Sequence, residues 1–194
     1  MRVLIACEFS GIVRDAFIAR GHDAMSCDLL PTERPGPHIQ GDVLGILNDG
    51  WDMMIAHPPC TYLSYAAMRV WNQAGREEKR QEAIEFVKKL WNAPIPKMAI
   101  ENPKSALIKW KRQDQIINPF DFGEAIRKPV YLWLKNLPVL MMGVTINVKP
   151  IRVSAKGKNI YFCDNVSGWN KEKQRKDRSR FFPGIAAAMV EQWG

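Results

Sequence analysis

The sequence has few cysteines and histidines, and it lacks any long hydrophobic run. Its 194 residues include four cysteines and three histidines. Cys7, Cys27, Cys60 and Cys163 form no CxxC pair, so we expect no metal and free, mostly buried thiols. No apolar stretch approaches the ~20 residues that span a bilayer, and the first residues do not form a signal peptide. We therefore expect a cytoplasmic protein with no membrane partner.

An excess of positive charge is the clearest property of the composition. The net charge is +8 and the pI is about 9.4, which favours an anionic partner, usually a nucleic acid. A basic protein without such a partner is the alternative. Hydrophobic residues make up 46% and charged residues 25% of the chain, as in ordinary globular proteins. We expect a single domain over residues 1–194.

Short apolar runs alternate with helical patterns through the first hundred residues, which predicts an α/β fold. The expected sheet is mostly parallel, with helices on both of its faces. The expected strands are 2–7, 24–27, 39–42, 51–56 and 97–100, and the clearest helices are 12–20 and 77–91. In the first helix, Ile12, Val13, Ala16, Phe17 and Ile18 are expected to cover one side.

The second half of the chain has weaker patterns. Residues 130–134 are strand-like, residues 141–148 and 159–162 are weaker strand candidates, and residues 185–193 form an amphipathic closing helix. Residues 141–180 are expected to form a basic insert or arm. Its cations, which are candidates for binding nucleic acid, are Lys171, Lys173, Arg175, Lys176 and Arg178. A solvated surface segment is the alternative for them.

Chemically suggestive residues follow the expected strands at their carboxyl ends, where ligands bind in parallel sheets. Phe9-Ser10-Gly11 follows the first strand, and its tight turn lets backbone N–H groups approach a ligand. Asp28 ends the second strand and can accept hydrogen bonds from ribose hydroxyls, or it caps a loop. Asp42 ends the third strand and can bind an adenine amino group, cap a helix, or do both.

Cys60 lies in His57-Pro58-Pro59-Cys60, directly after the fourth strand. Two prolines stiffen this loop, and a nucleophile needs a fixed position. Cysteine is the best nucleophile among common side chains once it is ionised, although a buried inert thiol is the alternative. His57 precedes two rigid prolines and is not expected to be the activating base. Ser64 either binds a ligand or caps the following segment.

Glu101-Asn102-Pro103 follows the fifth strand, which neighbours the fourth in a doubly wound sheet. Glu101 is therefore expected close to Cys60. A protonated carboxyl can bind a ring nitrogen and make the ring more electrophilic. A surface acid that caps a helix is the alternative.

In this order, these residues resemble the DNA cytosine-5 methyltransferase family over about residues 1–135, with a possible closing helix at 182–193. The shared features are Phe9-Ser10-Gly11, acids after strands two and three, Pro59-Cys60 and Glu101-Asn102. The resemblance implies a Rossmann-like fold that binds S-adenosylmethionine. The cofactor contacts that it implies are Phe9, Ser10, Gly11, Asp28, Leu29, Asp42 and Pro58.

The chemistry implied by the resemblance is covalent. Cys60 attacks carbon 6 of cytosine, Glu101 protonates or hydrogen-bonds ring nitrogen 3, and carbon 5 takes the methyl group. Arg127 occupies the place of the first of two family arginines and would hold the cytosine or a phosphate. A surface arginine is the alternative. In duplex DNA the base must be flipped out of the stack.

The chain departs from the family pattern in three places. Val13 replaces a glycine of the cofactor loop, Pro129 replaces the second arginine, and the insert is too short for a full target-recognition domain. Short forms of this kind look like phage proteins. Methylation of a free cytosine nucleotide or of RNA is one alternative function, and a non-catalytic protein that binds DNA or a partner is another. Amino-directed methylation fits poorly, because it has no use for Cys60.

Overall fold

The computed structural model describes residues 1–150, 152–155, 157, 159–160 and 180–194. Its centre is a seven-stranded sheet with the strand order β3-β2-β1-β4-β5-β7-β6. The strands are β1 (Arg2–Ala6), β2 (Asp23–Asp28), β3 (His38–Gln40), β4 (Met53–Ala56), β5 (Lys97–Asn102), β6 (Gln115–Ile117) and β7 (Val130–Lys135). The five strands from β3 to β5 pair in parallel, and β7 is antiparallel to both of its neighbours. The predicted α/β class and mostly parallel sheet are confirmed.

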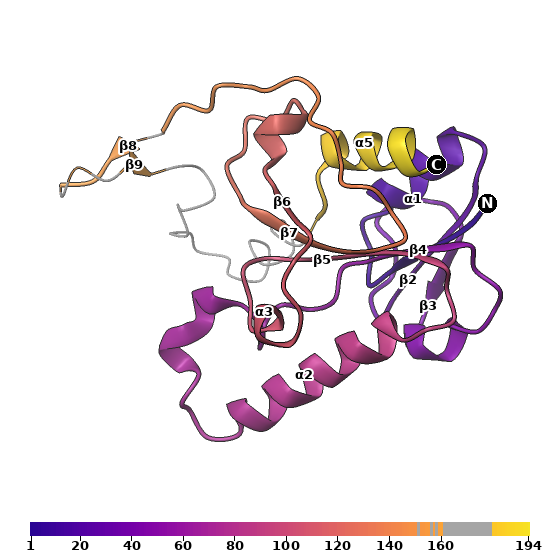
Figure 1. Cartoon of the computed structure of the whole chain (residues 1–194), viewed down its shortest axis with the longest axis horizontal. Coiled ribbons are helices and arrows are strands. Elements are labelled where there is room, and N and C mark those ends of the chain that lie inside the picture. Colours follow the sequence, from indigo (N-terminus) through magenta and orange to yellow (C-terminus); the bar gives the residue numbers. More distant parts are fainter. Residues whose placement is uncertain (151, 156, 158, 161–179) are drawn as a thin grey trace.

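Strand alternation places apolar side chains on both faces of the sheet, and helices cover both. Val3 and Ile5 of β1 face one core, while Leu4 and Ala6 face the other. The first core includes α1 (Ile12–Ala19) and α5 (Pro183–Trp193), which lie side by side in Figure 1. The second core includes α2 (Arg76–Trp91) and α3 (Leu107–Trp110), on the opposite face. The expected covering of both faces is thus confirmed.

Strand β5 is two residues longer than the sequence predicts. Antiparallel β7 pairs Leu132 with Glu101 and Tyr131 with Asn102, and these pairs extend the ladder beyond Ile100. The pattern in the sequence could not show this, because polar residues stand at both positions. The ladder now holds the backbone of Glu101 in a strand and not in a loop.

The first helix buries a different set of residues from the one predicted. Its buried residues are Val13, Arg14 and Phe17, whereas Ile18 is 39% exposed. Ile18 was expected on the buried side because it is apolar, but its direction around the helix points it away from the sheet. The three 3-10 segments are η1 (Val43–Ile46), η2 (Tyr65–Val70) and η3 (Pro119–Phe122).

The strand predicted over residues 141–148 is wrong. These residues are irregular, and most of their large apolar side chains are exposed, including Met141, Met142 and Val144. Their backbone bonds run to η3 and to Gln192 of α5 instead of to a neighbouring strand. A separate two-stranded ladder joins β8 (Arg152–Val153) and β9 (Asn159–Ile160). No helix among the described residues is both long and apolar enough to span a membrane.

Candidate active site

The register of the parallel strands places three polar side chains in one row. Ala6 of β1 pairs with Cys27 of β2 and with Ala56 of β4, and Ala56 pairs with Ile100 of β5. The next residues along β2, β4 and β5 are Asp28, His57 and Glu101. The carboxyl edge of the sheet therefore carries a carboxylate, an imidazole and a second carboxylate.

The Cys60 loop is anchored below its exposed tip. Pro58 is buried, whereas Pro59 and Cys60 are exposed. The backbone amides of Leu63 and Ser64 both donate to the Cys60 carbonyl, at 3.1 and 2.9 Å. This turn fixes the backbone that carries the thiol. Because Cys60 is exposed, the burial considered as an alternative from the sequence does not occur.

Asn102 ties this loop to the end of β5. Its side-chain amide donates to the Pro58 carbonyl at 2.9 Å, and the residue is 1% exposed. Leu63 accepts a hydrogen bond from the Ala106 amide at 2.9 Å, and Ser64 forms a bridge with Ser105. The segments that follow β4 and β5 are thus fastened together, and Cys60 and Glu101 are carried by one connected structure. Nothing in the spacing of the sequence predicted these bonds.

The Glu101 carboxylate is largely buried beside an imidazole. Its side chain is 16% exposed, and Oε2 lies 3.2 Å from Nδ1 of His57. Because β7 is antiparallel to β5, the start of β7 lies at the same edge, with Arg127 three residues before Val130. Arg127 is exposed, and its guanidinium lies 6.0 Å from the centre of the Phe120 ring.

The turn after β1 is organised by a buried acid. Glu8 Oε1 accepts hydrogen bonds from the Ser10 hydroxyl at 3.0 Å and from the Val13 amide at 2.8 Å. Gly11 precedes α1 as its N-cap residue and has a φ of 73°, a left-handed conformation that favours glycine. Glu8 Oε2 is buried without a partner among the described residues. Phe9 and Ser10 are themselves nearly buried, so it is mainly their backbone that a ligand would meet.

Asp28 is a partly buried carboxylate at the end of β2. Burial raises its pKa, and hydrogen bonds from the Leu30 and Leu29 amides, with nearby His38 and His57, partly offset this effect. Leu29 beside it is 73% exposed and offers an apolar surface to a base. This pairing of an acid with an apolar surface fits the nucleoside end of the cofactor that the resemblance implies.

Asp42 and Ser64 both cap short helices. Asp42 is exposed and accepts a hydrogen bond from the Leu44 amide at 3.0 Å, at the start of η1. Ser64 accepts one from the Ala66 amide at 3.2 Å, at the start of η2. The alternative of a helix cap is therefore confirmed for both residues. A side chain that caps a helix can also contact a ligand.

Arg14 is a buried cation that the sequence did not single out. It is fully buried, it forms an ion pair with Asp15 at 2.8 Å, and its guanidinium donates to the Ser26 and Thr32 hydroxyls and to the Arg34 carbonyl. A Cβ at Gly11 would lie 2.5 Å from Nη2 of Arg14, so this guanidinium fills the space beside the turn. The only signal in the sequence was its helical spacing from Phe17.

The other described cysteines are poor nucleophiles. Burial raises the pKa of Cys27 to about 11, and it raises the pKa of Cys7 further still, with Asp28 contributing to both shifts. Both thiols therefore stay protonated at neutral pH. Cys163 lies outside the described residues.

Basic and aromatic residues meet directly beside the Cys60 loop. The Arg76 guanidinium and the Lys79 ammonium lie over the Tyr62 ring, at 5.0 and 5.5 Å from its centre. Arg76 also donates to the Thr61 carbonyl at 3.4 Å. This cluster was not predicted from the sequence, because it joins a loop to the first turns of α2. The predicted basic residues from Lys171 to Arg178 lie outside the described residues.

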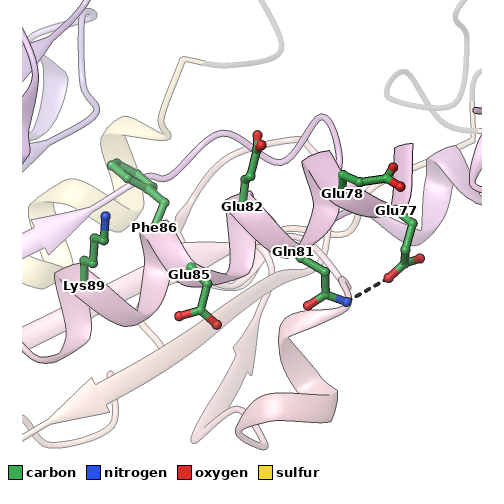
Figure 2. A pocket seen from close by; sticks show the side chains of 7 residues that line it. All are labelled: Glu77, Glu78, Gln81, Glu82, Glu85, Phe86 and Lys89. Carbon is green, nitrogen blue, oxygen red and sulfur yellow. Dashed lines mark hydrogen bonds between the residues drawn. The ribbon is translucent and has the colours of Figure 1, made fainter. Parts of the chain in front are cut away.

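Two surface hollows border α2. The one in Figure 2 is lined mostly by acids of the exposed helix face, including Glu78, Glu82 and Glu85, with Phe86. The other is lined by residues such as Trp71, Arg80 and Trp110. Neither hollow is lined by Cys60 or Glu101.

Comparisons of the sequence with protein families and with curated proteins give no match. No protein-family model matches the sequence, and the search of curated proteins found no match to it. Among the residues that the structure describes, no three His, Cys, Asp or Glu side chains gather so that they could hold a metal ion. The site must therefore be interpreted from its own geometry.

Proposed function

We propose that this protein is a methyltransferase of the Rossmann-like class that uses S-adenosylmethionine to methylate carbon 5 of cytosine in DNA. The observation that carries this proposal is the pairing of an exposed Cys60 thiol with the shielded Glu101 carboxylate on adjacent strand ends. Asn102 joins the two segments, and a nucleophile and an acid must hold a fixed relation to one ring. The resemblance of the motifs agrees with this interpretation.

The topology supports a nucleoside cofactor at the same edge. Strand β1 lies between β2 and β4, so the chain order reverses there, and ligands of doubly wound sheets bind at such switch points. Asp28 and Leu29 would hold the adenosine, and the Phe9-Ser10-Gly11 turn would lie against the rest of the cofactor. Pro58 and Asp42 complete the predicted contacts. When bound, S-adenosylmethionine supplies an electrophilic methyl group.

The residues of the chain would carry out the remaining steps. The Cys60 thiolate adds to carbon 6 of cytosine while Glu101 gives a proton to ring nitrogen 3, which makes carbon 5 nucleophilic. After carbon 5 has taken the methyl group, it loses its proton to solvent. The electron pair of that C–H bond re-forms the ring double bond and expels the thiolate. Nitrogen 3 then returns its proton to Glu101, and the cytosine keeps the methyl group.

DNA is the favoured substrate because cations lie beside Cys60. Arg76 and Lys79 present charge next to the nucleophile, on a chain whose net charge is +8. Phosphate contacts dominate DNA affinity. The acidic face of α2 shown in Figure 2 would be repelled by DNA and would therefore face solvent.

The test is analysis of nucleosides from host DNA after expression, with Cys60→Ser as the control. We expect 5-methylcytosine with the native chain and none with Cys60→Ser, because serine is a far weaker nucleophile at neutral pH. DNA containing 5-fluorocytosine should trap a covalent complex with the native chain alone. If cofactor and DNA both bind but neither product forms, the proposal is wrong.

A second candidate function follows from Arg14. Its guanidinium fills the space beside Gly11, where the resemblance implies cofactor contact. This observation favours a non-catalytic DNA-binding protein with a degenerate cofactor site. Calorimetry with S-adenosylmethionine separates the two, since only the methyltransferase should bind it.

A further inference from the structure

His57 has a more defined environment than its place before two prolines suggests. Its backbone amide donates to the Ala6 carbonyl at 2.9 Å, which continues the pairing of β4 with β1. Its side chain is only 9% exposed. The Phe181 ring, from the segment before α5, lies over the imidazole with the ring centres 4.5 Å apart. His57 is therefore held in two ways, by the hydrogen bond of its backbone amide and by the packing of Phe181 against its imidazole ring.

The two ring nitrogens of His57 differ in their surroundings. Nδ1 lies 3.2 Å from Glu101 Oε2, whereas Nε2 is buried without a hydrogen-bond partner among the described residues. A hydrogen bond at Nδ1 fixes the orientation of a carboxylate that would otherwise rotate. The unpartnered Nε2 leaves a polar position open at the site, where a bound molecule or a water can complete the bonding.

The proposed chemistry requires Glu101 to transfer a proton as well as to keep a fixed orientation. Glu101 gives its proton to nitrogen 3 and becomes a shielded carboxylate, which is unfavourable without a nearby positive charge. Among the described residues, Glu101 from β5 and Asp28 from the end of β2 are the charged groups near His57, and Phe181 adds an apolar face. Two acids on the same edge of the sheet therefore lie near the imidazole.

We infer that His57 is the positioning residue of Glu101 and renews the proton that Glu101 passes to the cytosine ring. This inference rests on the proposed function. As the thiolate adds to carbon 6, the O–H proton of Glu101 moves to nitrogen 3, and the Nδ1 proton of His57 moves to the carboxylate. When the thiolate leaves, nitrogen 3 returns its proton to Glu101, and Nδ1 takes back its own. No proton is gained or lost by the pair over a cycle.

The test compares His57→Asn with the native chain. The asparagine amide can stand where Nδ1 stands and can donate to Glu101, but it cannot release a proton in the working pH range. We expect single-turnover methylation by the native chain to slow as the pH rises, since a histidine that has lost its proton cannot pass one to Glu101. His57→Asn should be slower by about 10²-fold and should lose this pH dependence, as expected when a proton-transfer group is removed.

The matched control is His22→Asn. His22 also packs against a phenylalanine, with its ring centre 5.5 Å from that of Phe17, but it precedes β2 at the opposite edge of the sheet. Its substitution should leave the rate and the pH profile unchanged. If His57→Asn methylates with the native rate and pH profile, the inference is overturned while the proposed function stands.

A second measurement does not depend on activity. The chain has three histidines, so ¹⁵N-labelled imidazole signals can be assigned by removing His57. Glu101→Gln should change the His57 signals and leave those of His22 and His38 in place. Unchanged His57 signals would overturn the inference whether or not the protein methylates DNA. An inactive native chain with changed signals would contradict the proposed function and the proton transfer with it, and would leave only the positioning of Glu101 by His57.

Discussion

At the scale of single residues, the site contrasts one exposed thiol with buried ones. Cys60 lies on a rigid exposed loop, while burial raises the pKa of both Cys7 and Cys27. The buried Cys7 and Cys27 therefore differ from the exposed Cys60, mainly through burial and partly through the nearby charge of Asp28. This contrast supports assigning the covalent step to Cys60.

Asp28 illustrates a conflict between stability and binding. Burial raises the pKa of Asp28 in the folded protein above its value in the unfolded chain. Above the folded-state pKa, the buried charge therefore lowers the free energy of unfolding. This cost disappears as the pH falls below the unfolded-state pKa. Asp28→Asn keeps the oxygen that accepts from Leu30 and removes the charge. At pH 7 we expect this variant to be at least as stable as the native chain in chemical denaturation.

The same variant should bind S-adenosylmethionine about 10- to 100-fold more weakly, because hydrogen bonds to charged groups contribute about 1.5–3 kcal/mol. Calorimetry measures this affinity. Unchanged affinity together with unchanged stability would remove Asp28 from the site.

At the scale of elements, the bond between Asn102 and the Pro58 carbonyl joins β5 to the Cys60 loop. Asn102→Asp replaces the amide donor with a buried carboxylate facing a carbonyl. We expect the free energy of unfolding to fall by at least about 1–3 kcal/mol, the cost of a buried unsatisfied group. Thermal or chemical denaturation measures this change, and the yield of the 5-fluorocytosine adduct should fall with it.

Asn136→Asp is the matched control for that substitution. Asn136 also donates its side-chain amide to a proline carbonyl, that of Pro96, at 2.8 Å, but at an exposed position. Its loss should change stability by no more than about 0.5 kcal/mol. Equal effects of the two substitutions would mean that burial of the Asn102 bond is unimportant.

The first turns of α2 supply the second prediction at this scale. Arg76→Ala with Lys79→Ala removes the two cations over Tyr62 beside Cys60. Binding to DNA, measured as a function of salt, should weaken for every sequence. The salt slope should fall by about 1 for each phosphate that the variant no longer neutralises.

Lys88→Ala with Lys89→Ala removes the same charge from the last turn of α2 and serves as the control. These two lysines lie at the other end of the helix from Tyr62. If both double variants weaken binding equally, net charge explains the affinity, and the surface beside Cys60 has no special role.

At the scale of the whole molecule, two cores share one sheet. Trp193 of α5 lies in one core and Leu90 of α2 in the other, and both side chains are at most 3% exposed. Because the same strands supply both cores, we expect one cooperative unfolding transition. Trp193→Ala and Leu90→Ala should each lower the stability measured from that transition, by about 3–5 and 2–5 kcal/mol respectively.

Chemical denaturation followed by fluorescence and by circular dichroism checks this prediction. The control is Glu191→Ala, an exposed neighbour of Trp193, which should change stability by no more than about 0.5 kcal/mol. Two separate transitions, of which each core variant moves only one, would contradict a single domain.

The sequence by itself determined the alternation of strands and helices and the edge of the sheet at which the candidate residues lie. Buried strands and amphipathic helices leave periodic patterns, and acids after strands mark carboxyl ends, so Asp28, Cys60 and Glu101 could be named in advance. Periodicity says nothing about the partners of a polar side chain. Irregular segments, such as residues 141–148, have no period to read, and there the prediction was wrong.

Only the tertiary structure decided which side chains meet. The register of β4 against β5 brings His57 beside Glu101, and the end of the chain lays Phe181 over the imidazole. The loop after β2 buries Arg14, because Thr32 and Arg34 of this loop accept hydrogen bonds from its guanidinium. These contacts join residues that are tens of positions apart in the chain. They depend on how several elements pack at once, and no local pattern of residues records that packing.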